Sequence, residues 1–359
     1  MYTLVRLSAT LSWRNLILHA FASAWVVDIR VICVILPVAT VGILLYKNLW
    51  IEKGSARMVI IKTAAYIFLT FAFMIPMWPI LMDGPFHEIV AAARQMSANV
   101  EYHGLNLFNG KFYTGADTPG QYQFAWFFMT TPVIYSLAFI AGIIFLCYEF
   151  LKSKNSFTSN IFIWLSLGFY IVPPAAMWYA HTIVNGGWRH VFMIYPFFVL
   201  VCVFAINKLI EKGAVTRIVT VTILTASLVF NLGMTCYLHP FEYTYFNPVA
   251  VKCLAPLDRR FEIDYYGPSF RQGFNYLLKN HYKGKPLKVI VSNHPGYENY
   301  LALPAADRAK IKFLQPYEEK DADFFLNMHR WDQHPSQIQH PIYEYRRLGN
   351  RIMTIYTLP

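Results

Sequence analysis

Long apolar runs constrain the fold of this chain more than any other feature of its sequence. A transmembrane helix needs about 20 mostly apolar residues, because unpaired backbone groups are too costly in hydrocarbon. A weaker run, 11–27, is short and interrupted by Arg14 and His19. Six strong runs meet the requirement, and they are 31–50, 59–81, 132–151, 160–180, 191–210 and 217–238. The sequence therefore predicts a membrane protein with an all-α bundle of about six to seven transmembrane helices.

Charged residues are distributed unevenly along the chain. They make up 14% of the 359 residues, whereas soluble domains carry about 25%. Before Leu238 the charges are sparse and clustered, and after it they appear every few residues. We therefore expect a transmembrane bundle over 1–238 in lipid and a small α/β domain over 239–359 in water.

Basic residues gather at alternate connections between the apolar runs. Cytoplasmic loops of membrane proteins are enriched in Lys and Arg, so these clusters predict an orientation. We expect an integral protein of the cytoplasmic (inner) membrane, with the loops 82–131 and 181–190 and the domain 239–359 on the outer side. The clusters are Lys47, Lys53, Arg57 and Lys62; Lys152 and Lys154; and Lys208, Lys212 and Arg217.

Several other classes of protein are disfavoured. A formal net charge of +11 suits nucleic-acid binding, but the chain has no basic-aromatic motif of that class, so we expect no nucleic-acid partner. Four of the five cysteines lie in or at the end of apolar runs, without the spacing of metal ligands. The sequence also has no glycine-rich nucleotide loop, no haem or zinc spacing and no nucleophile elbow.

The loop 82–131 is too long for a simple connection. Apolar residues at helical spacing predict a helix over 85–100, which would lie flat on the outer surface. The stretch 102–122 is rich in Gly, Asn and Tyr and predicts irregular structure. Residues 126–129 then return the chain to the membrane. In the C-terminal domain we predict a helix over 269–281 and strands over 287–291, 322–328 and 351–358.

Two polar clusters stand at the ends of apolar runs. Asp28 and Arg30 form the first, and charged residues at such places either serve a function or reach toward lipid headgroups. The second cluster, Trp78-Pro79 followed by Asp83-Gly84-Pro85, is typical of a helix end with an aromatic anchor at the membrane interface.

A third cluster is the short loop 185–190, with the sequence Asn-Gly-Gly-Trp-Arg-His. Glycines free backbone amides, and the fork of Arg189 suits a phosphate or pyrophosphate. The face of Trp188 suits a sugar ring. The same residues also suit a tight turn with an interfacial Trp and an Arg that binds lipid headgroups, and the sequence leaves both interpretations open.

The fourth cluster, 239–248, opens the predicted outer domain. Its His, Glu, Tyr and Asn side chains suit the recognition of hydroxyl groups, and they equally suit a packed connector between bundle and domain. The motif Asp-Tyr-Tyr-Gly at 264–267 follows, and we expect it to close the same surface.

In their order and topology these clusters resemble a branch of the GT-C superfamily of membrane glycosyltransferases, related to protein O-mannosyltransferases and aminoarabinose transferases (family 39-like). Each motif alone is weak, and the resemblance runs from about Asp28 to the end of the chain. The matching stretches are Trp78-Pro79 with Pro85; 107–132 with Gly110, Pro119, Tyr122 and Thr130-Thr131-Pro132; Gly187-Trp188-Arg189-His190 to Pro196; His239-Pro240 to Tyr245-Phe246-Asn247; and Asp264-Tyr265-Tyr266-Gly267.

The resemblance implies a sugar donor carried on a polyprenyl phosphate and used at the outer face of the membrane, with inversion by direct displacement. It also implies a carboxylate base in the first outer loop, an assisting divalent metal, and basic residues that hold the leaving phosphate. On this sequence, Arg189 and His190 would contact the donor phosphate, with Arg30 as a second cation. The residues implied for the cavity and the acceptor are Trp188, Glu242, Tyr243, Asn247 and Asp264.

The sequence departs from the family pattern at its beginning. The family's base follows the first span, several spans before the region matched here, and Asp28 has the setting of a later helix junction. We therefore expect a C-terminal portion of such an enzyme, with the base on a missing N-terminal portion or a partner chain. The alternative is a non-catalytic membrane scaffold or partner subunit with an outer binding domain. A transporter is disfavoured, because Pro173-Pro174 alone indicates a broken helix.

Overall fold

The computed structural model describes residues 1–51, 54–98, 104–114, 117–153, 155–329 and 341–358. The chain divides into two compact units according to which residues contact one another. The predicted boundary at residue 238 instead divides the chain by solvent, lipid before it and water after it, and stays a prediction. Unit 1 comprises Met1–Tyr102, Phe157–Ile183 and Met193–Phe197, and unit 2 comprises His103–Ser156, Val184–Phe192 and Phe198–Pro359.

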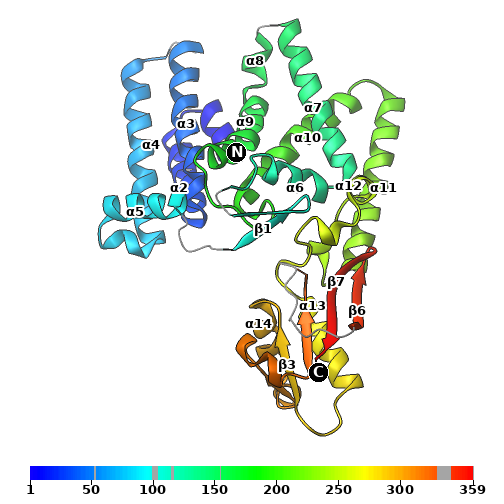
Figure 1. Cartoon of the computed structure of the whole chain (residues 1–359). Coiled ribbons are helices and arrows are strands. Elements are labelled where there is room, and N and C mark those ends of the chain that lie inside the picture. Colours follow the sequence, from blue (N-terminus) through cyan, green and yellow to red (C-terminus); the bar gives the residue numbers. More distant parts are fainter. Residues whose placement is uncertain (52–53, 99–103, 115–116, 154, 330–340, 359) are drawn as a thin grey trace. The chain divides into compact units, whose positions relative to one another are not determined.

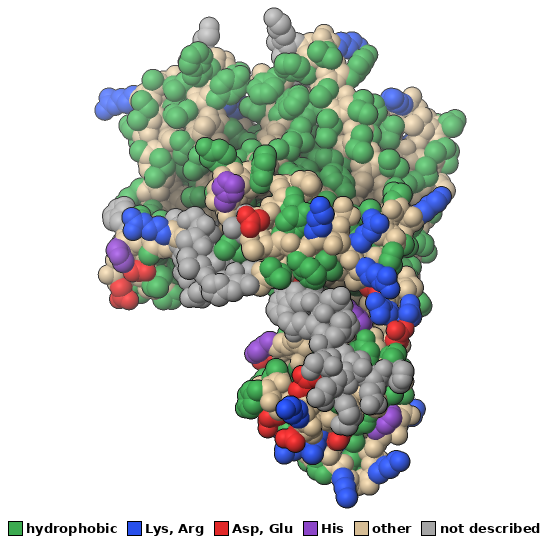
Figure 2. Space-filling view, in the orientation of Figure 1, with side chains coloured by type: hydrophobic (Ala, Val, Ile, Leu, Met, Phe, Trp, Pro, Cys, Tyr) green, Lys and Arg blue, Asp and Glu red, His purple; other side chains and the backbone are tan. Residues whose placement is uncertain are grey.

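Six helices in the described part of the chain are long and apolar enough to cross a membrane, as the sequence predicts. Apolar side chains cover much of their surface in Figure 2, whereas charged side chains are frequent around the C-terminal sheet. Such apolar surfaces are stable in lipid rather than in water, which suggests a membrane protein. The helices are Val31–Ile51, Ala56–Met77, Val133–Lys152, Ile161–Tyr179, Arg189–Ile210 and Ala214–Leu238.

The regular elements of unit 1 are all helical among its described residues. Helix α2, the weakest predicted span, is formed but has 17 residues. It packs on α4 through Tyr66, whose hydroxyl lies 2.8 Å from Ser23 Oγ and whose ring stacks on His19. The predicted helix 85–100 is confirmed over Pro85–Ala98 as α5, and its last two positions lie outside the described residues. The elements are α1 (Tyr2–Ala9), α2 (Trp13–Ile29), a 3-10 turn (Val31–Val34), α3 (Ile35–Leu45), a π-helical turn (Tyr46–Ile51), α4 (Ala56–Met77), a 3-10 turn (Pro79–Met82), α5 (Pro85–Ala98) and α9 (Ile161–Tyr179).

The other described helices follow the predicted spans closely and add several short segments (Figure 1). They are α6 (Tyr122–Thr130), α7 (Val133–Lys152), α8 (Asn155–Ser159), α10 (Tyr195–Ile210) after a 3-10 turn (Arg189–Ile194), α11 (Ala214–Leu238), α12 (Pro248–Leu254), α13 (Ser269–Asn280), α14 (Pro295–Leu301) and α15 (Ala305–Arg308), with 3-10 turns at Glu242–Thr244, Leu257–Arg259 and Pro316–Asp321.

Helices α7 and α10 run in the same direction. Three contacts advance together along both helices: the rings of Phe139 and Phe198 stack 4.8 Å apart, Gly142 meets Val201, and Glu149 pairs with Lys208 at 2.6 Å. Helix α11 returns toward their beginning, where the Nδ2 of Asn231 donates to the hydroxyl of Tyr135. The last turns of α7 and α10 therefore lie at the same end, and they carry Lys152 and Lys208.

The contact between α7 and α10 leaves no room for a side chain at Gly142. An added Cβ would lie 2.5 Å from the carbonyl oxygen of Val201. We expect Gly142→Ala to lower the free energy of unfolding by about 1–3 kcal/mol, because the helices must separate. The midpoint of thermal unfolding in detergent measures the change.

The matched control is Gly168→Ala in α9, where nothing lies within 4 Å of an added Cβ. This variant should keep or slightly raise the midpoint, since Ala has a higher helix propensity than Gly. Equal midpoints for the two variants would contradict the tight contact at Gly142.

A β-hairpin replaces part of the irregular structure predicted for 102–122. Strand β1 (Leu105–Phe108) pairs antiparallel with β2 (Lys111–Thr114). The turn between them has positive φ at Asn109 (50°) and Gly110 (78°). This is the conformation that an Asn-Gly pair favours in a two-residue hairpin, so the prediction of irregular structure was wrong for these residues.

The C-terminal region forms a five-stranded sheet with the order β4-β3-β5-β7-β6. Strand β3 is parallel to β4 and β5, and β7 is antiparallel to β5 and β6. Helix α13 buries Phe270, Phe274 and Leu277 against this sheet. The predicted helix and three predicted strands are confirmed, and β4 and β6 were not predicted. The strands are β3 (Leu287–Val291), β4 (Ile311–Phe313), β5 (Phe324–Asn327), β6 (Pro341–Arg347) and β7 (Asn350–Thr357).

Candidate functional site

The centre of the candidate site is the buried side chain of Asn185, which is 3% exposed. Its Oδ1 accepts hydrogen bonds from Arg189 Nη2 at 2.5 Å and from the Tyr265 hydroxyl at 3.3 Å, and His190 Nε2 lies 3.1 Å away. A carbonyl oxygen has two lone pairs, so Asn185 Oδ1 cannot fully satisfy three hydrogen-bond donors. An anion at this place would offer Arg189 and His190 additional acceptor oxygens.

Two glycines shape the loop that carries Arg189. Gly186 and Gly187 have φ angles of 61° and 71°, in the left-handed region that favours glycine. A Cβ on Gly186 would lie 3.2 Å from both the Arg189 side chain and the Tyr265 ring. The loop is also fixed by two tyrosines: Tyr243 OH donates to the Gly186 carbonyl, and the Gly187 N–H donates to the hydroxyl of Tyr122, both at 3.0 Å.

Arg189 stands over an aromatic wall. Its guanidinium carbon lies 4.8 Å from the centre of the Tyr265 ring, and the rings of Tyr243 and Tyr266 adjoin Tyr265. Within the described residues, no carboxylate lies within ion-pair distance of Arg189. The aromatic face and Asn185 orient the cation and leave part of its donor fork for a ligand.

Tyr243 joins the loop to the region that follows α11. Burial raises the pKa of its hydroxyl, the nearby Tyr266 and Glu262 raise it further, and Arg189 opposes them. The hydroxyl therefore stays protonated and acts as a donor to Gly186. This contact joins the third and fourth sequence clusters.

Asp264 is buried beside this wall, at 2% exposure. Its Oδ2 accepts from the hydroxyl and the backbone N–H of Ser269. Burial raises the pKa of this carboxyl from 3.8 to about 7, although the bonds from Ser269 oppose the rise. The group titrates near neutral pH, and its burial makes it a part of the support of the 264–267 turn rather than of the open surface.

Trp188 and Asn247, both implied for the cavity, are engaged in packing. The indole N–H of Trp188 donates to Thr130 Oγ1 at 3.0 Å, and its ring stacks on Phe192. Asn247 Nδ2 donates to the carbonyls of Phe128 and Thr131, and its Oδ1 caps α12. Asn247 also lines an apolar cavity of about 320 Å³ between α6, α7 and α12.

Glu242 pairs with a neighbouring histidine, and Arg30 belongs to unit 1 rather than to the unit that contains Asn185. Glu242 is exposed and pairs with His239 Nδ1 at 2.7 Å; a backbone hydrogen bond at Glu242 and the bond from His239 lower the pKa of its carboxyl. Arg30 follows the end of α2 in unit 1, whereas Arg189 belongs to unit 2. The role of Arg30 as a second phosphate cation stays a prediction.

A metal site is not formed by the described residues. In that part of the chain, no three His, Cys, Asp or Glu side chains come together as ligands. The divalent metal that the family resemblance implies stays a prediction, and no step of the chemistry is assigned to it.

Asn185, Tyr265, which donates to Asn185, and Tyr122, which accepts from the Gly187 N–H, were not among the predicted site residues. The glycines after Asn185 mark a turn, but nothing in the sequence indicates that its side chain faces Tyr265, 80 positions away. Comparisons with models of protein families, with curated proteins and with solved structures find no match to this chain.

Proposed function

We propose that this protein is a membrane glycosyltransferase, or a portion of one, that transfers a sugar from a polyprenyl-phosphate donor to an acceptor at the outer face of the membrane. The observation that carries the proposal is the setting of Arg189. It combines a cation oriented by Asn185 and Tyr265 with a position at the first residue of a span-length apolar helix, Arg189–Ile210. A phosphate attached to a lipid tail lies at that level of a bilayer.

The contacts within unit 2 support the proposed polarity. The loop 82–131, the turn 185–190 and the C-terminal region must share one side of the membrane for a common sugar site. The Gly187 N–H donates to the hydroxyl of Tyr122 at 3.0 Å, and Tyr243 donates to the Gly186 carbonyl, so described parts of all three touch.

Basic residues lie at the C-terminal ends of α7 and α10, whereas Arg189 precedes the N-terminal end of α10. Lys208 pairs with Glu149 near the end of α7, and Lys212 lies 4.9 Å from the ring centre of Phe145. A helix of 20 residues is about 30 Å long, which is the thickness of the hydrocarbon core. By the positive-inside rule the basic end is cytoplasmic, and the Arg189 cluster is then on the outer side of the inner membrane.

The chemistry of the transfer gives Arg189 its role. The acceptor oxygen bonds to the anomeric carbon while the bond from that carbon to the phosphate oxygen breaks. Polyprenyl phosphate leaves with the electron pair, and the acceptor proton passes to a base outside the residues assigned here. Negative charge grows on the phosphate, so the charged hydrogen bonds of Arg189 and His190 strengthen as the reaction proceeds.

Removal of the guanidinium should weaken donor binding. We expect Arg189→Ala to raise the Kd for a polyprenyl phosphate, titrated into the full chain in lipid nanodiscs, roughly tenfold to hundredfold. Arg189→Lys keeps the charge without the fork and should have an intermediate Kd. Sugar transfer, measured as release of polyprenyl phosphate, should fall in the same order.

Arg271→Ala provides the matched control, because Arg271 is an exposed arginine of the same unit on α13. It should bind the polyprenyl phosphate as the parent does. Equal affinities for the parent and Arg189→Ala would remove Arg189 from the donor site and overturn the proposal.

The second candidate function is a non-catalytic membrane subunit. The packing of Trp188 and Asn247 favours it, since neither indole N–H nor amide is directed to a sugar. Such a subunit would bind a lipid phosphate at Arg189 and release none in the transfer assay, even when the complete partner protein is supplied. Transfer that depends on Arg189 distinguishes the enzyme from this alternative.

A further inference from the structure

A polar cavity of about 470 Å³ lies in unit 2, and it shares no residue with the Arg189 cluster. Its wall combines the turn of the β1–β2 hairpin with the segment around Asp258, the end of β5 and the beginning of β7. The hairpin is fastened there by the Gly110 N–H, which donates to the carbonyl of Arg260 at 3.1 Å. The volume is within the range of small-molecule sites.

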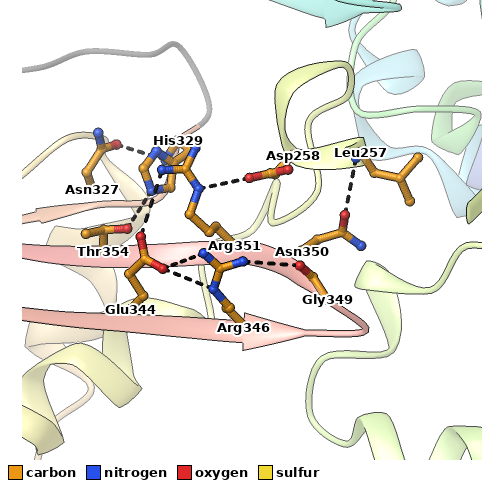
Figure 3. Close-up of polar contacts among 10 residues, drawn as sticks. All are labelled: Leu257, Asp258, Asn327, His329, Glu344, Arg346, Gly349, Asn350, Arg351 and Thr354. Atoms are coloured by element: carbon orange, nitrogen blue, oxygen red, sulfur yellow. Dashed lines mark hydrogen bonds and ion pairs between the residues drawn. The ribbon is translucent and has the colours of Figure 1, made fainter. Parts of the chain in front are cut away.

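Arg351 lies on β7 and provides a cation held in place at the cavity wall. Its Nε donates to Asp258 Oδ2 at 3.0 Å, and its Nη1 lies 4.0 Å from Glu344 Oε1 (Figure 3). Its side chain is 25% exposed, so the two carboxylates orient the guanidinium without enclosing it. An oriented fork of this kind suits a planar or tetrahedral oxyanion.

Arg259 adds a second cation to the same wall. It is exposed and, among the residues that the structure describes, makes no ion pair. Lys111 and Arg260 flank the lining residues in the sequence, so four cations belong to this region, against Asp258 among the described lining residues and Glu344 beside Arg351. The balance of charge therefore favours an anion.

The rest of the wall offers contacts to a hydroxylated ring. Asp258 has acceptor capacity beyond its bond to Arg351. Phe112, which is 44% exposed, presents an aromatic face. His329 is held by its backbone bond to Asn327 Oδ1 and by its Nε2, which lies 2.7 Å from Thr354 Oγ1. Figure 3 shows His329 and Arg351 on the same side of β7.

From these groups we infer a second ligand site, which binds a sugar that carries a phosphate or a carboxylate. Arg351 and Arg259 bind the anionic group, Asp258 accepts hydrogen bonds from hydroxyl groups, and Phe112 packs against the C–H face of the ring. The site does not depend on the proposed glycosyltransferase activity.

Binding of glucose 1-phosphate, glucuronate, glucose and inorganic phosphate to the purified full chain in detergent tests the site. We expect saturable binding of glucose 1-phosphate or glucuronate, whichever anion the site selects, and weaker binding of glucose. Arg259→Gln should raise the Kd of the anionic sugar roughly tenfold. Because Arg259 makes no ion pair among the described residues, the Arg259→Gln variant should fold as the parent does. The control Arg271→Gln should bind the anionic sugar as the parent does.

Two further variants separate the parts of the site. Phe112→Ala should weaken the binding of the anionic sugar and leave the binding of inorganic phosphate unchanged, because it removes the contact with the sugar ring. Arg189→Gln should keep the binding of the anionic sugar, which separates this site from the proposed donor site. Absence of saturable binding of both anionic sugars, or equal affinities for the parent and Arg259→Gln, would overturn the inference.

Discussion

The free energy of unfolding should fall by about 3 kcal/mol between pH 4 and pH 7 through the titration of one group, Asp264. Burial raises the pKa of its carboxyl from 3.8 to about 7. Well below pH 3.8 both the folded and the unfolded chain hold the proton, so the full stability is present. As the pH rises, the unfolded chain releases the proton first and is favoured, until the folded chain also releases it near pH 7.

Asp264→Asn removes this titration and should flatten the fall of stability with pH. Denaturant unfolding at pH 4, 5.5 and 7.5 measures it. Asp307→Asn is the control for the change in net charge, since Asp307 pairs with Lys310 at the surface. Parallel pH profiles for the parent and Asp264→Asn would show that the buried carboxyl is not the source of the dependence.

Asn247→Ala should lower the free energy of unfolding by about 3–5 kcal/mol. Its Nδ2 donates to the carbonyls of Phe128 and Thr131 at 2.6 and 2.9 Å, and its Oδ1 accepts from the N–H of Ala250 at 2.9 Å. The side chain is buried, so the variant removes the hydrogen bond that Asn247 provides to each of these three backbone groups. Asn247→Asp keeps the helix cap but loses the two donated bonds, and should cost nearly as much.

The control for this substitution is Asn280→Ala at the end of α13, where an exposed amide makes one bond to the Tyr276 carbonyl. Its effect should be within about 0.5 kcal/mol. Thermal midpoints of the detergent-solubilised variants give the comparison. A similar midpoint for Asn247→Ala and Asn280→Ala would contradict a structural role for Asn247.

The elements that were predictable from the sequence depend on periodicity and length. An apolar run of 20 residues has few folds open to it, so the six long helices were predicted within a few residues. In α13, apolar residues recur at helical spacing, and Phe270, Phe274 and Leu277 are all fully buried. The β-branched run 287–291 is strand β3 without any shift.

The hairpin β1–β2 was also predictable, since its signal is present. Asn109-Gly110 stands between Leu-Asn-Leu-Phe and Lys-Phe-Tyr-Thr, which is a strong pattern for a two-residue turn. The abundance of Gly, Asn and Tyr across 102–122 concealed it. Strand β4 has three residues and is formed through its pairing with β3, so its own sequence carries little signal.

The candidate site was predictable in its motifs and not in its connections. The turn 185–190 and the motif 264–267 were both singled out, and the structure brings Arg189 onto Tyr265. The central role of Asn185 depends on residues 4, 5 and 80 positions away at once. The engagement of Asn247 with the end of α6 is equally non-local, with a separation of 119 residues. The neighbouring residues in the sequence do not indicate such long-range contacts.

The shared direction of α7 and α10 has a consequence for biogenesis. Two adjacent helices that point the same way oblige the chain between Lys152 and Arg189 to travel back first, and α9 is the span-length helix in that stretch. If the helices span a membrane, as we propose, a failure of α9 to cross it would invert α10 and separate Lys208 from Glu149. The contact between Gly142 and Val201 could then not form, so its formation would report the correct insertion of α7, α9 and α10.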